Sequence, residues 1–307
     1  MPHIPCISRL LFAATAVFAV PFAAAAADSF RKLVIGDAEL IALRDAGGDA
    51  DVSLLIGAGG DELSRYAPNG KMPSQINAFV LKLGGKTILV DSGLGRDRGG
   101  KALDALADAG IRTEDIEIVL LTHLHVDHVG GIVEKGSRVF PNARILVARR
   151  ERSWWLDPEE VKRAAPDRKG SFELPKAALG AYSEKVETFE FGDEVAPGVK
   201  AMNGVGHTAG HTVFDVDAGG GKRFLVIGDL VHFGVIQFPN PGVAVRYDSE
   251  PVEAVRARKD VFSLAARAKL PIAGMHIAFP GVGTLERDGE GFAYTPLDYP
   301  ASHSAAK

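Results

Sequence analysis

The stretch from Thr122 to His128 reads Thr-His-Leu-His-Val-Asp-His and places three histidines and one aspartate within seven residues. Imidazole and carboxylate groups at this density are typical ligands of zinc and similar divalent ions. Residues 116–121 are apolar and β-branched, which predicts a buried strand before the cluster, and Gly130-Gly131 permits a sharp turn after it. The sequence therefore predicts a fold that presents a metal site on a loop at the carboxyl end of a core strand.

The composition is that of an ordinary globular protein. The chain has 307 residues, of which 46% are hydrophobic and 24% are charged, so it is long enough for one large domain. A formal net charge of −4 argues against the broad basic field that nucleic-acid binding requires, and we expect no nucleic-acid partner.

The N-terminus has the pattern of an export signal. Arg9 precedes an apolar stretch over residues 10–20, and an alanine run up to Ala27 supplies small residues for cleavage. We therefore expect a signal peptide over residues 1–27 and a single mature domain over 28–307. The expected location is periplasmic or secreted, with no membrane anchor after cleavage. Cleavage would remove Cys6, the only cysteine, so the mature chain would contain no disulfide.

Hydrophobic patterning predicts alternating strands and helices. Helices are expected over residues 101–109, over 149–165 with a break at Pro158, and over 251–269. The segment 45–77 is rich in glycine and polar residues, and we interpret it as a long loop near the site entrance. The charged run over residues 149–152 is expected to be a solvated helix face. Strands are expected over residues 32–35, 40–43, 78–83, 87–90, 116–121, 144–148, 186–191, 199–202, 212–216, 223–227 and 272–275.

Three further candidate ligands follow predicted strands or lie in glycine-rich turns. His207 lies in Gly-His-Thr-Ala-Gly-His, Asp229 follows the strand at 223–227, and His276 follows the strand at 272–275. These positions match that of His123, so the same ligand chemistry recurs at several strand ends. A non-catalytic protein that only binds metal stays an alternative, although no ligand position is missing.

These motifs together resemble those of the metallo-β-lactamase superfamily. The resemblance implies an α/β fold, the αββα sandwich, in which two β-sheets are flanked by helices and a dinuclear metal site lies at one edge. It implies that His123, His125 and His207 hold one ion, that Asp127, His128 and His276 hold the other, and that Asp229 bridges both.

This ligand set suits two divalent metal ions, zinc first, with iron, manganese or cobalt as alternatives. Two such ions share a hydroxide that acts as the nucleophile, so no serine or cysteine is needed. Asp127 and Asp229 are the expected catalytic carboxylates, because Asp127 can also shuttle a proton to the leaving group. His211 is expected to fix a ligand through a hydrogen bond instead of binding metal itself.

Within the superfamily the chain resembles methyl parathion hydrolase and related secreted lactonases. The segments 228–238 and 276–283 and the export signal carry this resemblance. It implies a small-molecule lactone or aryl ester substrate, with phosphotriester hydrolysis as a side activity. Trp155 and Phe172 match pocket aromatics of that group, with ordinary helix packing as the alternative. For His232 both a pocket position and an inert surface position stay open.

A glyoxalase II-like thioesterase is the alternative enzyme. Such thioesterases carry a C-terminal helical domain with basic residues, and the sequence after His276 is short for such a domain. Relatives often form dimers, so a homodimer is possible, but no stripe of apolar residues specifies one.

Overall fold

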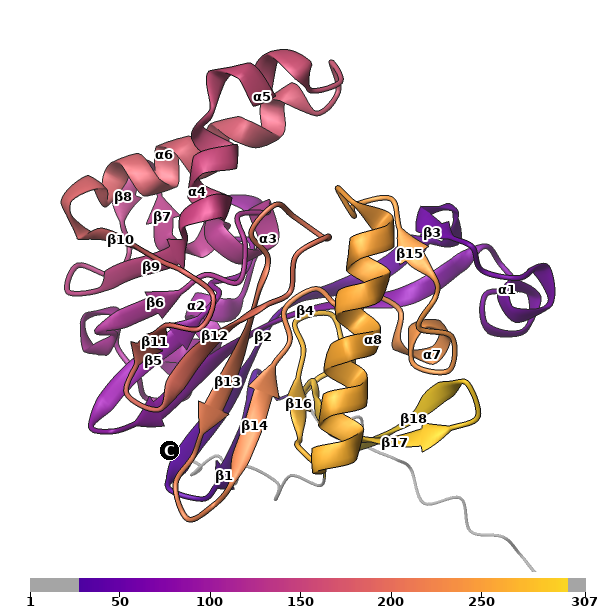
Figure 1. Cartoon of the computed structure of the whole chain (residues 1–307). Helices are drawn as coiled ribbons and strands as arrows, with labels where there is room; N and C mark the ends of the chain where they lie inside the picture. The colour runs from indigo at the N-terminus through magenta and orange to yellow at the C-terminus, as the bar shows by residue number, and fades with distance from the viewer. Residues whose placement is uncertain (1–27, 298–307) are drawn as a thin grey trace, which may run out of the picture.

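The computed structural model describes residues 28–297 and contains two seven-stranded β-sheets (Figure 1). The predicted signal peptide at 1–27 lies outside the described residues. The first sheet consists, in spatial order, of β1 (Phe30–Ile35), β2 (Ala38–Asp51), β4 (Lys71–Leu83), β5 (Lys86–Val90), β6 (Ile118–Leu120), β9 (Arg144–Ala148) and β10 (Val186–Phe189). The second consists of β11 (Glu194–Ala196), β12 (Val199–Asn203), β13 (Thr212–Asp217), β14 (Arg223–Val226), β16 (Ile272–Ala273), β17 (Val282–Asp288) and β18 (Gly291–Pro296). Two small sheets pair β3 (Leu55–Ile56) with β15 (Ala244–Val245) and β7 (Val133–Glu134) with β8 (Ser137–Arg138).

The side chains of the central strands alternate between two apolar environments. In β4, Phe79 and Leu81 point into the space between the sheets, whereas Ala78 and Val80 point to the helices outside. Phe214 of β13 faces the same inter-sheet core as Phe79, from the other sheet. Because both faces of these strands are buried, their sequences are continuously apolar instead of alternating with polar residues.

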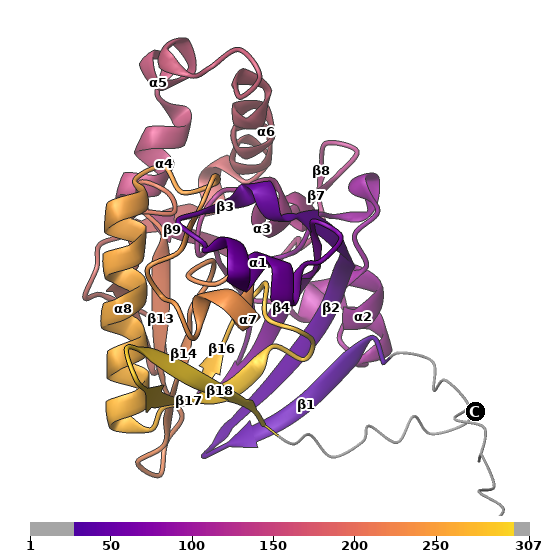
Figure 2. The same ribbon diagram turned by 90° about the vertical axis from the view of Figure 1, so that its right-hand side faces the viewer.

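Helices cover the outer face of each sheet (Figures 1 and 2). On the first sheet lie α2 (Ala102–Asp108), α4 (Arg149–Leu156) and α6 (Glu173–Ala181), which share one core with it, and on the second lies α8 (Pro251–Ala268). The shorter helices are α1 (Gly60–Tyr66), α3 (Val126–Val129), α5 (Pro158–Arg163) and α7 (Gly234–Gln237). These layers confirm the predicted αββα sandwich. Within residues 28–297 no helix has both the length and the apolar character that a membrane crossing needs.

Most predicted elements are present, and β9 has the predicted bounds. The break at Pro158 separates α4 from α5, and Pro158 begins α5 at a position where its missing N–H costs nothing. The prediction of a long loop over 45–77 was wrong. There β2 and β4 continue as a two-stranded ribbon that pairs Gly47 with Gln75 and Asp49 with Pro73. A ribbon of two strands has free edges, which tolerate proline.

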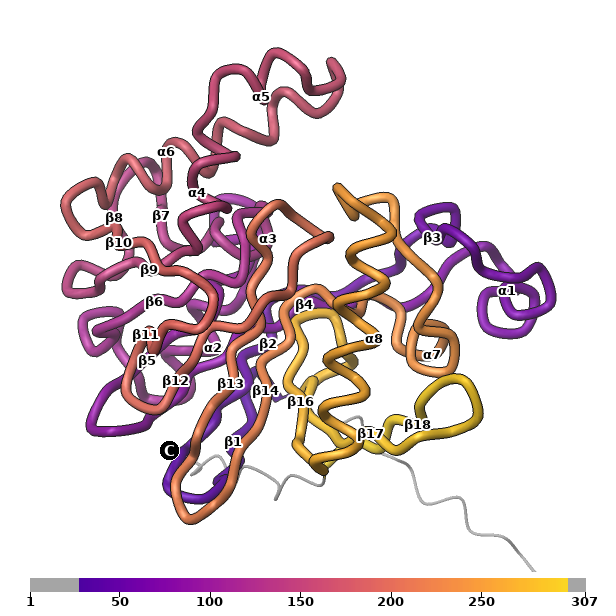
Figure 3. Tube along the Cα trace, viewed as in Figure 1, coloured from indigo at the N-terminus to yellow at the C-terminus, as the bar shows by residue number. Residues whose placement is uncertain are grey.

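The strand directions bring the candidate ligands to one edge of the sandwich. β5, β6 and β9 are mutually parallel, and β14 is parallel to β16, so the carboxyl ends of neighbouring strands lie together. The loop after β12 lies at the same edge as α3 in the backbone trace (Figure 3). β13 begins beside the turn after β6, because the N–H of Thr212 donates to the carbonyl of Thr122.

Candidate metal centre

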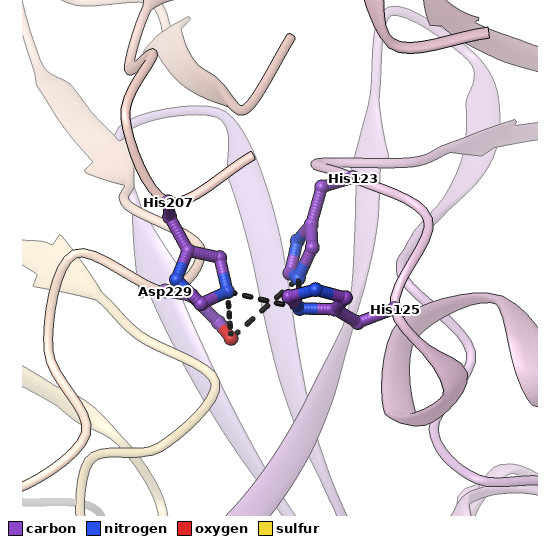
Figure 4. Close-up of side chains that lie close together, drawn as sticks. All are labelled: His123, His125, His207 and Asp229. Atoms are coloured by element: carbon purple, nitrogen blue, oxygen red, sulfur yellow. Dashed lines mark hydrogen bonds and ion pairs between the residues drawn. The ribbon is translucent and has the colours of Figure 1, made fainter. Parts of the chain in front are cut away.

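Four side chains from three segments form the first cluster (Figure 4). His123 and His125 come from the turn after β6, His207 from the loop between β12 and β13, and Asp229 from the end of β14. Nδ1 of His125 lies 3.0 Å from Nε2 of His123 and 3.0 Å from Nε2 of His207. Oδ2 of Asp229 lies 3.2 Å from Nε2 of His207 and 3.6 Å from Nε2 of His123.

The second cluster consists of Asp127, His128 and His276, and it adjoins the first through Asp229. Oδ2 of Asp127 lies 3.7 Å from Nε2 of His128 and 3.4 Å from Nε2 of His276. Oδ1 of Asp229 lies 3.2 Å from Nε2 of His128, while its Oδ2 lies 3.1 Å from Nε2 of His276. Oδ1 of Asp229 thus faces the second cluster, while Oδ2 lies close to imidazoles of both clusters. The structure brings together all seven predicted ligand residues.

The spacing of these atoms fits cation binding. A tetrahedral zinc site with bond lengths of about 2.0–2.1 Å has ligand atoms roughly 3.4 Å apart. The four contacts given for the first cluster, at 3.0–3.6 Å, bracket that value. Nε2 of His128 and Oδ1 of Asp229 are buried and have no aligned hydrogen-bond partner. A cation between them would satisfy both, so the residues present fit a divalent metal pair.

The electrostatics favour the ligand forms of His123, His125 and Asp229. Burial, reinforced by the neighbouring histidines, holds the pKa of His123 and of His125 well below the usual range, so both imidazoles are neutral. Burial acts to raise the pKa of Asp229, but the surrounding histidines outweigh it and hold that pKa well below its usual range. Asp229 is therefore an ionised carboxylate among neutral and cationic imidazoles.

Two buried aspartates orient the metal-facing imidazoles from behind. Asp91, after β5, accepts from Nδ1 of His128 at 2.7 Å and from the backbone N–H of Thr122 at 2.8 Å. Asp248 accepts from Nδ1 of His207 at 2.9 Å. A carboxylate behind an imidazole fixes its tautomer and makes the outward nitrogen a better ligand. Our sequence analysis assigned neither role, although the place of Asp91 at a strand end could have indicated it.

His276 is oriented by the ribbon that was predicted to be a loop. Nδ1 of His276 donates to the backbone carbonyl of Gln75 at 2.6 Å, and Gln75 lies in β4. The side-chain amide of Asn77, also in β4, donates to the carbonyl of Ile277 at 2.8 Å. The extended strand thus supplies polar backbone and side-chain groups at fixed positions, which a long loop would not do.

His211 uses both ring nitrogens within the protein. Nδ1 donates to the carbonyl of Gly204 at 2.9 Å, and Nε2 accepts the backbone N–H of Asp229 at 2.9 Å. Burial and the nearby His207 lower the pKa of His211 to about 3, so the ring is neutral and its tautomer is fixed. This placement is the one expected for a residue that positions the backbone of Asp229 and binds no metal.

His232 was predicted to lie in the pocket wall or on the surface, and the structure places it directly beside the candidate metal ligands. Its Nε2 is 3.2 Å from Oδ2 of Asp229, and its ring stacks on His276 with centroids 4.7 Å apart. The backbone N–H of His232 donates to the side chain of Gln237, which fixes this segment. His232 therefore belongs to a third group of possible ligand atoms with Asp229 and His276.

A cavity of about 800 Å³ opens onto the centre. His125, Asp127, Asp229 and His276 line it together with His232, so ligand atoms of both clusters face the same space. Trp155 and Phe172 also line it, with ring centroids 4.9 Å apart, and Trp154 packs edge-to-face against Trp155. The structure therefore places all three predicted pocket residues, Trp155, Phe172 and His232, at the cavity wall.

The charged run at 149–152 is not the uniformly solvated face that we expected. Glu151 is completely buried, whereas Arg149, Arg150 and Arg152 are exposed. Glu151 lies on the inner side of α4, where it contacts the loops that carry the ligands. The sequence pattern did not indicate that Glu151 is buried, because three of the four charged residues at 149–152 are arginines and exposed.

Replacing Asp248 by asparagine is expected to weaken metal binding by about 10–100-fold. The amide no longer carries the charge that strengthens His207 as a ligand, although it keeps the size of the carboxylate. Competition with a chromophoric chelator measures the change. Asp260→Asn, on the exposed face of α8, is the matched control. Unchanged affinity in Asp248→Asn would reject the orienting role.

Comparison with known families gives one match that covers most of the fold. The profile described as "Metallo-beta-lactamase superfamily" matches residues 72–270. Among curated proteins, a probable metallo-hydrolase of Mycobacterium tuberculosis is 31% identical over 115 residues, 36% of either chain. An atrochrysone carboxyl ACP thioesterase of Aspergillus fumigatus is 40% identical over 76 residues, 24% of this chain and 23% of that protein. These matches thus span well under half the length of the curated relatives.

Two solved structures resemble the chain over nearly its whole described length. The hydrolase AbOPH of the β-lactamase superfamily has a TM-score of 0.84 and 30% sequence identity, covering 89% of this chain and 98% of that one. AidC, a dizinc quorum-quenching lactonase solved with the product N-hexanoyl-L-homoserine, has a TM-score of 0.81 and 26% identity, with the same coverage of both chains.

Proposed function

The chain belongs to the metallo-β-lactamase superfamily, and from this we propose that it is a dinuclear metal-dependent hydrolase that opens lactones or cleaves aryl esters. The observation that carries the proposal is the convergence of seven imidazole and carboxylate side chains, four of which line one cavity. Phosphotriester hydrolysis is proposed as a side activity of the same site.

His123, His125 and His207 would hold one ion, Asp127, His128 and His276 the other, and Asp229 would contact both. When bound, such a pair of ions activates a water molecule as nucleophile and polarises the carbonyl oxygen that it attacks. Zinc fits this donor set, and iron, manganese or cobalt would also be accepted by it.

The residues of the chain supply orientation and proton transfer. Asp127 is the more exposed of the two site carboxylates, with a side chain 20% exposed against 2% for Asp229, and it lines the cavity. It is therefore the group that can carry a proton to the leaving oxygen. Asp229 is held too deeply for that role. Its backbone is fixed by His211, and its carboxylate maintains the spacing of the two clusters.

The cavity favours a substrate with an apolar part next to its ester bond. Trp154, Trp155 and Phe172 form one wall, and Leu54 and Ile76 from the β2–β4 region also line the space. Arg163 and Arg168 lie at the same cavity, so its lining is not uniformly apolar. An acyl or aryl group would bury its carbons against the aromatic rings while the ester bond lies at the metal centre.

A substrate panel tests the proposal on the zinc-loaded protein. We expect the highest kcat/KM on an acyl-homoserine lactone, an aryl lactone or an aryl acetate, and a lower value on a phosphotriester. A glutathione thioester and a β-lactam complete the panel. The thioesterase match gives the second candidate a specific basis, and a thioester that exceeds every lactone and ester would favour it. No turnover of any of these by protein with two bound ions would reject the hydrolase.

Phe172→Leu is expected to raise KM by about 10-fold for substrates with long apolar acyl chains and to leave kcat nearly unchanged. Phe172 is 4% exposed and contacts both tryptophans, so the change removes aromatic surface from the cavity wall without touching a ligand residue. Steady-state kinetics with a short-chain and a long-chain lactone measure the difference. An equal change of KM for both would remove Phe172 from the acyl-binding wall.

The location of the protein is proposed from the N-terminal sequence. We infer that residues 1–27 direct export and are removed, leaving a periplasmic or secreted hydrolase. Mass spectrometry of protein recovered from a periplasmic fraction would detect a mature N-terminus near Asp28. Recovery of uncleaved chain only from the cytoplasm would contradict the proposal.

A further inference from the structure

Glu151 is a buried carboxylate whose two oxygens are both fully engaged. Oε1 accepts the backbone N–H of Leu124 at 3.0 Å and the indole N–H of Trp155 at 2.7 Å. Oε2 accepts the hydroxyl of Thr208 at 2.8 Å and the backbone N–H of Gly210 at 2.7 Å. Within the described chain no ion pair reaches Glu151, so these four donors alone compensate its charge.

Three of the four donors come from the segments that carry the first cluster, and the fourth, the indole of Trp155, comes from α4 itself. Leu124 lies between His123 and His125, and Thr208 follows His207 directly. None of the four is next to His128 or His276 in the sequence. Figure 4 shows the three imidazoles that these two loops supply. A single carboxylate on α4 therefore connects both loops of the first cluster.

The loop around His207 is pressed against this carboxylate at close range. A Cβ atom on Gly210 would lie 2.4 Å from the backbone nitrogen of Glu151 and 2.6 Å from its Cβ. Only glycine permits this approach, so the loop has little room to move independently of α4. A displacement of Glu151 is thereby passed to the backbone next to His207.

The same carboxylate also fixes the cavity wall. Oε1, which holds the ligand loop at Leu124, holds the indole of Trp155 one helical turn further along α4. Trp155 lines the cavity, and its ring centroid lies 5.7 Å from that of His125 in an edge-to-face arrangement. Glu151 thus sets the distance between the aromatic wall and the first cluster.

We propose that Glu151 is a positioning residue of the active site, which fixes the imidazoles of the first cluster relative to one another and to the substrate wall at Trp155. This role rests on the proposed metallo-hydrolase function. It extends that function by assigning a further buried carboxylate to the support of the centre. Glu151 holds the backbone of both loops of the first cluster, whereas Asp91 holds the imidazole of His128 and the backbone N–H of Thr122.

Glu151→Gln removes the negative charge and keeps the size of the side chain. In the variant, an amide NH₂ group takes the place of one carboxylate oxygen. At the Oε2 position the hydroxyl of Thr208 can turn and accept from it, but the N–H of Gly210 loses its acceptor. At the Oε1 position the N–H groups of both Leu124 and Trp155 lose theirs. In either orientation a ligand loop is released at one point, and we expect the affinity of the first cluster to fall by about 10–100-fold.

The test measures zinc affinity in two backgrounds that each retain one cluster. His276→Ala disrupts the second cluster, and there Glu151→Gln is expected to show the full loss. His125→Ala disrupts the first cluster, and there Glu151→Gln is expected to change affinity less than about threefold. Chelator competition measures zinc, and Glu173→Gln on the exposed face of α6 is the matched control. A residue needed only for folding would weaken both backgrounds alike.

Two further variants keep the proposal testable if Glu151→Gln folds poorly. Thr208→Val removes one of the four donors, and we expect a smaller loss confined to the first cluster. Trp154→Phe leaves Trp155 as the only tryptophan, since the chain has two. Adding Glu151→Gln to it should then shift the Trp155 emission spectrum, because the indole loses a charged acceptor.

The outcomes separate the two proposals. If the unmodified protein binds none of zinc, iron, manganese and cobalt, the metallo-hydrolase proposal fails. If it binds two equivalents and Glu151→Gln leaves the first cluster unchanged, or weakens both clusters equally, only the positioning role is overturned. A loss confined to the first cluster together with a shifted Trp155 spectrum supports the role proposed here.

Discussion

Replacing Asp229 by alanine is expected to reduce kcat/KM by more than about 100-fold and to leave the protein with at most one tightly bound metal ion. This loss of kcat/KM is larger than the roughly 10–100-fold typical of residues that only hydrogen-bond to a ligand, because Asp229 itself faces both clusters. Oδ2 of Asp229 lies 3.1–3.6 Å from Nε2 of His123, His207, His232 and His276, and Oδ1 lies 3.2 Å from Nε2 of His128. Among residues 28–297, Asp229 is the one carboxylate that lies this close to all five imidazoles. Alanine removes its negative charge, so the repulsion between two bound cations would no longer be offset there.

Elemental analysis and kinetics on the same preparation test this. Asp229→Asn keeps the size of the side chain and the backbone bond to His211, so it should retain the fold while it loses the second ion. Asp288→Ala, at an exposed position of β17, should retain two ions and full activity. Two equivalents of metal still bound by Asp229→Ala would contradict the bridging role.

The sequence predicted which side chains come together, because their placement follows from strand ends. His123, Asp229 and His276 each follow a short apolar strand, and the strands around β6 and those around β14 bring their carboxyl ends to one edge. The end of a buried strand restricts the position of the residues that follow it to this edge of the sheet. Because neighbouring parallel strands end at the same edge, ligand residues that are far apart in the sequence come together there.

The groups that hold the ligands were harder to predict, because their roles depend on approaches between distant segments. Asp248 has no motif around it, and its function becomes visible only when the chain brings it behind His207. Glu151 is surrounded by arginines in the sequence, yet α4 turns it toward the interior and leaves the three arginines exposed. The β2–β4 ribbon contains glycine and proline, residues that weaken strand propensity, and long-range pairing between the two strands overrides that local preference.

The layer of polar residues around the clusters also explains why a carboxylate-rich site can remain folded. Asp91 and Glu151 are buried, and burial raises the pKa of each. Each nevertheless accepts hydrogen bonds from backbone N–H groups that have no other role in the sheets. Their desolvation is thereby offset by bonds that also fix the ligand loops, so stability and site geometry depend on the same contacts.

Removing metal with a chelator is expected to lower hydrolysis to about 1% or less and to reduce thermal stability, with both properties returning on addition of zinc. The cavity wall contains three serines, Ser74, Ser171 and Ser249, and no cysteine. In the described chain none of these three hydroxyls is hydrogen-bonded to a histidine, so none is activated to replace the water. Catalysis by the chain alone therefore lacks an activated nucleophile.

The loss of stability follows from linkage. An ion present at a hundredfold its Kd stabilises the native state by about 2.7 kcal/mol, so two ions should raise Tm by roughly 5–10 °C in a domain of this size. Calorimetry of metal-free and zinc-loaded protein measures the shift, and the same samples give the rates. Hydrolysis that persists in protein verified to be metal-free would refute the mechanism even if Tm changed. A higher Tm with zinc shows only that zinc binds. The rate of hydrolysis shows whether the bound ions take part in the reaction.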